Sequence, residues 1–298
     1  MEDGSQPPGA AIAPEHAYSG LILKPFKGAK RTIVILSLAL ASCRGPVSPA
    51  SPTPEVVSLR LLVDSATSPL LRDLASHYNP ANVLITWNVQ VGDASTVLDW
   101  IKQGEATYAL LDYVPSAAFD TRWWTTPIGQ DGIAVVVHAT NPITNLTAAQ
   151  FRAVLQGRVL NWNELGGPNM PMTLVARNDT SSDATIIQAL ALGDRRVTRN
   201  ARLATTSQAV VDIVSADSGA IGYVSMGYLN GTVRAVPLDG ILPTPDTVTA
   251  NQYPLRAPIV FVGLREPGND GYRAFFAWAQ SAEGQAIVRQ HYGGLARQ

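Results

Sequence analysis

The sequence lacks several features that mark common classes of protein. It has one cysteine, Cys43, which excludes disulfides within the chain and metal sites built from several cysteines. Its four histidines are scattered, with no H-E-x-x-H pattern or close pair, so zinc chemistry has no support. Neither G-x-G-x-x-G nor G-x-x-x-x-G-K-[ST] occurs, and nucleotide cofactors are therefore not indicated. We expect no cofactor and no metal.

An excess of charge of one sign is also missing. Lys plus Arg number 22 against 23 for Asp plus Glu, a formal net charge of −1. An even balance does not favour nucleic acid or an acidic membrane surface as a partner. With 298 residues, 46% of them hydrophobic, the chain can bury a sizeable core and is expected to form two lobes or domains.

A basic cluster precedes the most apolar run of the sequence. Residues 24–31 carry three lysines and an arginine, and residues 32–42 read TIVILSLALAS, about half of the roughly 20 residues that cross a bilayer. This pattern predicts a cleaved signal peptide rather than a permanent membrane helix. Residues 40–43, LASC, resemble the lipobox of bacterial lipoproteins, in which the cysteine is lipidated. The alternative is an ordinary buried cysteine after a chance apolar stretch.

The export pattern predicts where the folded part lies. Residues 1–43 are interpreted as a signal peptide with a lipobox, and Cys43 as the lipidation site. Residues 44–57 carry four prolines and no helical or strand period, so we expect an extended tether of roughly 43 Å at about 3.1 Å per residue. The globular part would begin near Ser58, in an extracytoplasmic location, anchored to the cell membrane.

Strand patterns alternate with helical patterns along the rest of the chain, which favours an α/β fold with a parallel sheet covered by helices. Thr147 is expected to cap the start of a helix that ends at Gly157. Strands are predicted in the stretches 57–66, 83–91, 106–112, 132–138, 172–177, 219–225 and 253–264. Helices are predicted in the stretches 68–78, 97–104, 145–157, 183–192, 207–217 and, as one or two helices, 270–292.

Three stretches together resemble one known family. These are NLTAAQFRAVLQGRVLNWNELGG (145–167), SGAIGYVSMGYL (218–229), and YPLRAPIVFVGL (253–264) with SAEGQAIV (281–288). They are similar to landmarks of the phosphate-type substrate-binding proteins of ABC transporters. The resemblance implies a two-lobed periplasmic-binding-protein-like (type II) fold, with an oxyanion in the cleft between the lobes. Lobe 1 would be 58–138 and 256–298, and lobe 2 would be 139–255.

The resemblance also implies partners and an absence of catalysis. The protein would be a monomer that is not an enzyme, and it would capture inorganic phosphate or a similar oxyanion for an ABC permease. A rival class is a secreted serine hydrolase that uses Ser225 and a histidine. That interpretation is weak because a nucleophile elbow, G-x-S-x-G, needs a glycine where Tyr223 stands.

The candidate site is formed by loops that follow a strand and open a helix: DSATS (64–68), GDAST (92–96) and RNDTSSDA (177–184). Backbone N–H groups at such helix starts suit an oxyanion. By the resemblance, Arg177, Ser181 and Asp112 fall on the family's arginine, serine and proton-accepting acid. The remaining candidates are Thr67 in the first loop, Asp93 at a serine position, Ser182 at a glycine position and Asp183 at a threonine position.

Asp93 and Asp183 therefore place carboxylates where the family has hydroxyls. Like charges about 4 Å apart repel by roughly 4 kcal/mol at an effective dielectric constant near 20. The site would then be restricted to protonated oxyanions, or it would hold another ligand and act as a sensor or scaffold. Simpler roles remain open: Asp183 and Asp93 as first-turn acids of helices (the former capped by Ser181 or Ser182), Arg177 as a surface ion-pairing residue, Asp112 as a turn residue.

Overall fold

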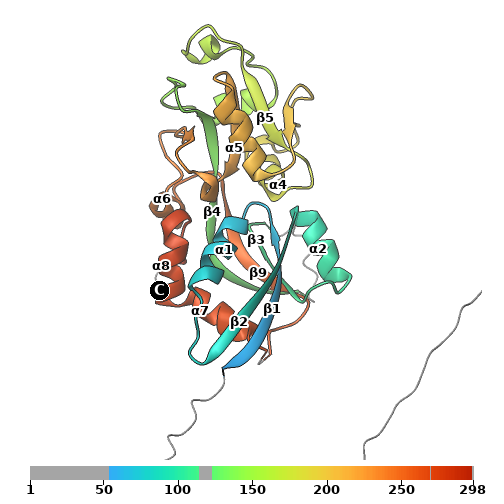
Figure 1. Ribbon diagram of the computed structural model, residues 1–298. Coiled ribbons are helices and arrows are strands. Elements are labelled where there is room, and N and C mark those ends of the chain that lie inside the picture. Colours follow the sequence, from blue (N-terminus) through green and yellow to red (C-terminus); the bar gives the residue numbers. More distant parts are fainter. Residues whose placement is uncertain (1–53, 114–122, 269, 297–298) are drawn as a thin grey trace, which may run out of the picture. The chain divides into compact units, whose positions relative to one another are not determined.

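The computed structural model describes residues 54–113, 123–268 and 270–296 (Figure 1). The predicted signal peptide (1–43), with Cys43, and the predicted tether up to residue 53 lie outside the described residues. Within the described part of the chain, no helix is long and apolar enough to cross a membrane.

The described strands form a 9-stranded sheet in the order β2-β1-β3-β9-β4-β7-β5-β6, and β8 pairs with β4 outside this path (Figure 1). β1 begins at Glu55, inside the stretch predicted as tether. The strands are β1 (Glu55–Asp64), β2 (Val83–Gly92), β3 (Tyr108–Leu111), β4 (Trp124–His138), β5 (Thr173–Arg177), β6 (Arg202–Ala204), β7 (Ala220–Ser225), β8 (Val233–Ala235) and β9 (Arg256–Gly263).

The sheet is mixed, so the prediction of a parallel sheet was wrong. β1 is parallel to β2 and β3, and β5 is parallel to β6 and β7. β9 is antiparallel to β3 and β4, and β4 is antiparallel to β7 and β8. Hydrophobic periodicity identifies a strand but not its direction, which explains the error.

β4 connects two groups of strands. Residues 124–132 pair with β9, whereas residues 133–138 pair with β7 and β8. We call β1, β2 and β3 the first strand group and β5, β6, β7 and β8 the second strand group. The single long strand β4 therefore carries the chain from one group to the other.

The ends of helix α3 (Ala148–Leu155) follow from the sequence. The Thr147 hydroxyl accepts a hydrogen bond from the Gln150 backbone, the Gln150 side chain accepts from the Thr147 backbone, and Gly157 has a φ of 67° just past the end. The predicted N-cap is confirmed, whereas the C-cap is Gln156 and Gly157 is the residue after it. The other helices are α1 (Ser68–His77), α2 (Ala94–Lys102), α4 (Ser182–Ile187), α5 (Ser207–Ala216), α6 (Pro245–Thr249), α7 (Tyr272–Gln280) and α8 (Ala282–His291), with short helical turns η2 (Trp162–Leu165), η3 (Gln188–Leu192) and η4 (Met226–Tyr228).

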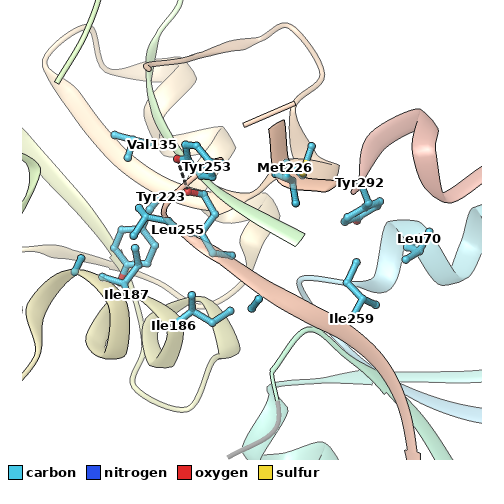
Figure 2. Packing of buried hydrophobic residues seen from close by; sticks show 14 of the residues in the cluster. Leu70, Val135, Ile186, Ile187, Tyr223, Met226, Tyr253, Leu255, Ile259 and Tyr292 are labelled. Carbon is cyan, nitrogen blue, oxygen red and sulfur yellow. Dashed lines mark hydrogen bonds between the residues drawn. The ribbon is translucent and has the colours of Figure 1, made fainter. Parts of the chain in front are cut away.

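The apolar core fixes the helix that carries part of the candidate site. Ile186 and Ile187 of α4 belong to one buried cluster with Tyr223 of β7 and Ile259 of β9 (Figure 2). Each of these side chains is at most 1% exposed. Because a close-packed interior resists displacement, the start of α4 and the loop before it are held firmly relative to β5 and β7.

Gly284 allows a close approach of α7 and α8. A Cβ atom at this position would overlap backbone atoms of Trp278 and Ala279, which cannot rotate away. We expect Gly284→Ala to lower the free energy of unfolding in urea by about 1–3 kcal/mol, the usual cost of overpacking. Gly268→Ala is the control, since a Cβ there meets nothing within 4 Å. An equal effect of the two substitutions would contradict this view of the packing.

Candidate functional site

Three loops meet at the ends of strands from both groups. The β1–α1, β2–α2 and β5–α4 loops each follow a strand and precede a helix, as predicted. The β2–α2 and β5–α4 loops contact each other, because the backbone N–H and the hydroxyl of Ser95 both lie within hydrogen-bond reach of the Thr180 carbonyl, at 3.4 and 3.3 Å. Thus the first and second strand groups are joined at this point.

Arg177, the last residue of β5, is the central cation of the site. It is 2% exposed, so the interpretation as a surface ion-pairing residue is wrong. Its guanidinium donates to the Ser65 hydroxyl at 2.9 Å, to the Asp93 carboxylate at 3.0 Å and to the Ala204 carbonyl at 3.0 Å. Its Nε atom lies 3.6 Å from Asp183 Oδ2. The charge of Arg177 is therefore balanced within the protein.

Asp93 joins the two strand groups. It occupies the N-cap position of α2 but makes no capping hydrogen bond with its side chain. Instead its carboxylate accepts from Arg177 at 3.0 Å, from the Asn178 amide at 2.7 Å and from the Thr180 hydroxyl at 2.7 Å. The Asp93 carboxylate therefore does not act as a helix-start acid of α2. It acts as an internal anion against the second strand group.

Thr67 and Asp112 are brought together by a residue that the sequence reasoning missed. The backbone N–H and the hydroxyl of Thr67 donate to Asp64 Oδ1 at 2.8 and 2.6 Å, and the Asp112 backbone N–H donates to Asp64 Oδ2 at 3.2 Å. Both carboxyl oxygens of Asp112 are buried and lack a hydrogen-bond partner among the described residues. Burial, and then the neighbouring carboxylate of Asp64, raises the pKa of Asp112 well above its usual range.

The hydrogen bonds decide which of these two acids keeps the proton. Asp64 is stabilised as the anion by its two bonds from Thr67, whereas Asp112 is 0% exposed and has no donor to its carboxylate. We therefore infer that Asp112 carries the proton in the folded protein. Asp64 could have been identified from the sequence, because it is an acid at the end of a predicted strand, as Asp112 is.

Asp183 lies in the first turn of α4, and Ser181 caps that helix by accepting from the Ala184 N–H at 3.2 Å. Asp183 also accepts a hydrogen bond from Ser207 at 3.1 Å, besides its contact with Arg177. Burial raises the pKa of Asp183 to about 7, although Arg177 acts in the opposite direction. The close contact with Arg177 favours the ionised form of Asp183, and burial favours its protonated form. Asp183 therefore changes its charge near neutral pH. Ser182, the first residue of α4, is 2% exposed.

Three further residues that the sequence reasoning missed complete the cluster. Ser65 lies on the loop after β1 and Ser207 is the first residue of α5, and their hydroxyl oxygens are 3.5 Å apart. Asp131 of β4 is 0% exposed, and burial raises its pKa well above the usual range, with Asp183 and Asp64 adding to the effect. Asp131 could not be identified from the sequence, because it lies within strand β4 rather than in a strand-to-helix loop.

The balance of charge decides what this cluster can bind. Asp93 and Asp183 contact the guanidinium of Arg177, and the buried carboxyl groups of Asp64, Asp112 and Asp131 lie near enough to Asp183 or to one another to interact electrostatically. A fully ionised cluster would repel an anion strongly. An oxyanion fits only if several of these acids are protonated or if the ligand itself retains a proton that it can donate.

Ser225 is not placed as a nucleophile. It lies 0% exposed at the end of β7, and its hydroxyl accepts from the Gly227 N–H at 3.3 Å. The hydrogen bonds of His77 and His138 go to residues within four positions in the sequence. In the part of the chain that is described, no group of three or more His, Cys, Asp or Glu side chains has an arrangement that could hold a metal ion.

Known proteins are similar to this chain over most of its length. A family model described as a PBP superfamily domain matches residues 48–283. The phosphate-binding protein PstS of Bacillus subtilis is 26% identical over 204 residues, which cover 67% of this chain and 68% of that protein. PstS of Pseudomonas aeruginosa is 26% identical over 234 residues, 70% of this chain and 72% of that protein.

Solved structures give the same fold. A Clostridium perfringens protein assigned to phosphate ABC transport, crystallised with bound phosphate, superposes with a TM-score of 0.74. It is 24% identical and is covered completely, against 80% of this chain. An ABC-type phosphate transport receptor from Vibrio cholerae superposes with a TM-score of 0.63 at 22% identity, with 80% of this chain and 100% of that chain covered.

The mixed sheet and the loops at its strand ends thus define an α/β protein with a two-lobed, periplasmic-binding-protein-like (type II) fold, as predicted. The match to the family model extends from before β1 to the second residue of α8. The chain belongs to the PBP superfamily, and its resemblance to the phosphate-type substrate-binding proteins of ABC transporters is confirmed.

Proposed function

We propose that this chain is an extracytoplasmic solute-binding protein that captures phosphate or a related oxyanion and hands it to an ABC permease. The observation that carries the proposal is Arg177, a buried guanidinium at the meeting point of loops from both strand groups. The Ser65 hydroxyl accepts from Arg177 and can donate its own proton to a ligand. By the sequence resemblance, Arg177, Asp112 and Ser181 fall on the arginine, the acid and the serine of the phosphate-type family.

The carboxylates favour a protonated ligand and an acidic optimum. As the pH falls through about 7, Asp183 gains a proton, and its repulsion of an anion disappears. Arg177 remains cationic throughout this range. The affinity for phosphate should therefore increase with falling pH.

Calorimetry with inorganic phosphate at pH 5.5 and pH 8 tests this function. We expect tighter binding at pH 5.5 in the wild type and no binding at either pH in Arg177→Ala. Arg273→Ala is the matched control, since that side chain is 59% exposed and pairs with Glu266 at the surface. Absence of binding by the wild type at both pH values would show that the cluster is not an oxyanion site.

A second candidate function has one observation in its favour. Asp93 already supplies Arg177 with an internal anion and binds two other donors of the second strand group. If the Asp93 carboxylate takes the place of an anionic ligand next to Arg177, the protein would bind no oxyanion. It would then act as a sensor or scaffold, or would bind a different ligand. The same titration separates the two functions, because a scaffold would bind phosphate at neither pH.

We further propose a division into lobes, 58–138 with 256–298 and 139–255, that hinge where β4 passes between the strand groups. The hydrogen bond from the Ile133 N–H to the Leu255 carbonyl, 2.7 Å long, lies at this passage. A monomer of two such lobes would close around its ligand by rotation about this hinge.

Anchoring to the membrane through Cys43 is part of the proposal and rests on the basic cluster, the short apolar run and the lipobox pattern. In a bacterial host, Cys43→Ser should release the protein from the membrane fraction or leave it unprocessed. Fractionation followed by mass measurement of the product checks this. An unchanged distribution and mass in the variant would exclude lipidation at this cysteine.

A further inference from the structure

A pocket that adjoins the carboxylate cluster at Arg177 lies on the second strand group, against α4 and η3. Its volume is about 550 Å³, within the range of small-molecule sites. α4 and η3 contribute Ala184, Thr185 and Gln188, and the segment 196–199 contributes Arg196, Val197 and Arg199. The pocket therefore combines a cationic side with small apolar side chains.

Arg196 and Arg199 supply the available charge. Both are exposed, and neither guanidinium forms an ion pair or a hydrogen bond with another described residue. Arg177 also lines the pocket, but its guanidinium is already engaged by Asp93 and Asp183. Asp179 is the acid in the lining. Two guanidinium groups thus face one carboxylate.

The segment that carries these arginines is held at both ends. The Gln188 amide donates to the carbonyls of Gly193 and Arg195 at 2.6 and 2.5 Å. The Thr198 N–H donates to the Leu155 carbonyl at 2.8 Å. The backbone positions of Arg196 and Arg199 relative to α4 and η3 are therefore fixed, whereas their side chains must still be ordered on binding.

We propose that this pocket binds a phosphate monoester. A guanidinium presents a planar fork of donors that matches phosphate oxygens in pairs, and a dianionic phosphate can engage Arg196 and Arg199 together. The organic group of the ester would contact Ala184 and Val197. Inorganic phosphate would leave that apolar surface uncovered, so the ester is the better complement.

The test is calorimetric titration of phenyl phosphate into the full chain at pH 8. We expect binding by the wild type and a loss of roughly tenfold or more in affinity in the variant Arg196→Ala/Arg199→Ala, since both charge-assisted contacts are removed. The matched control is Arg158→Ala/Arg195→Ala. It removes the same charge from exposed arginines that line a different pocket of about 340 Å³, and its affinity should stay within about twofold of the wild type.

Three results would overturn the proposal. These are no binding of phenyl phosphate by the wild type, unchanged binding in Arg196→Ala/Arg199→Ala, and an equal loss in both double variants, which would indicate general surface charge. A titration of inorganic phosphate into the same proteins distinguishes binding at this pocket from binding at the Arg177 site. Failure of the wild type to bind inorganic phosphate would refute the oxyanion function and leave the ester pocket standing.

Discussion

Replacing Asp93 by Ser and Asp183 by Thr should strengthen phosphate binding by more than about tenfold. These substitutions restore the hydroxyls that the family resemblance places at both positions. They remove two carboxylates that lie 3.0 and 3.6 Å from the guanidinium of Arg177. The expected gain in binding free energy is smaller than the roughly 4 kcal/mol of repulsion between like charges 4 Å apart, because Asp93 is 18% exposed and solvent screens part of its charge.

The same variant should become less stable without phosphate. Removing both anions leaves Arg177 buried and unpaired, which is costly, and a bound anion would compensate for it. Calorimetry at pH 8 gives the affinity, and thermal unfolding with and without phosphate gives the stability. Asp99→Ser is the control, because Asp99 is an exposed acid of α2 paired with Lys102. An affinity no higher than that of the control would mean that the carboxylates do not compete with the ligand.

The variant and the wild type should also differ less at low pH. Asp183 gains its proton as the pH falls through about 7, so part of the repulsion removed by substitution is already absent at pH 5.5. A gain in affinity that is equal at pH 5.5 and pH 8 would assign the effect to Asp93 rather than to Asp183.

Most elements of the fold could be predicted because they depend on local patterns. The helix from Thr147 to Gly157 is specified by its caps, and the buried strands by continuous apolar runs. The antiparallel direction of β4 and β9 could not be predicted, because it depends on which strands lie next to each other in the folded sheet. The start of β1 at Glu55 was missed since Pro-rich sequence immediately precedes it.

The site could be predicted in part for a similar reason. Arg177 ends a strand, and Asp93 and Asp112 directly follow strands that the sequence predicts. That Asp93 reaches Asn178 and Thr180 could not be predicted, because 85 and 87 positions separate the partners. Such contacts depend on tertiary packing, which decides whether an acid caps its own helix or pairs with a distant arginine.

Asp112→Asn should stabilise the protein at alkaline pH and have little effect near pH 4. The folded protein keeps the Asp112 proton to a higher pH than the unfolded chain, because burial and Asp64 raise its pKa. Between about pH 3.9 and that raised pKa, the unfolded state binds fewer protons than the folded state. The free energy of unfolding of the wild type therefore falls as the pH rises across this window.

Asparagine removes this dependence because its amide stays neutral at every pH and is close in size and shape to a protonated carboxyl. One pKa unit corresponds to about 1.4 kcal/mol, and 1 kcal/mol moves the Tm of a domain this size by roughly 2–4 °C. Thermal unfolding at pH 4, 6 and 8 should show a Tm difference between Asp112→Asn and wild type that increases with pH. Asp99→Asn, at an exposed position, should show no such trend. A constant difference across the three pH values would mean that Asp112 does not hold a proton in the folded protein, and that the negative charge of the cluster is balanced in another way.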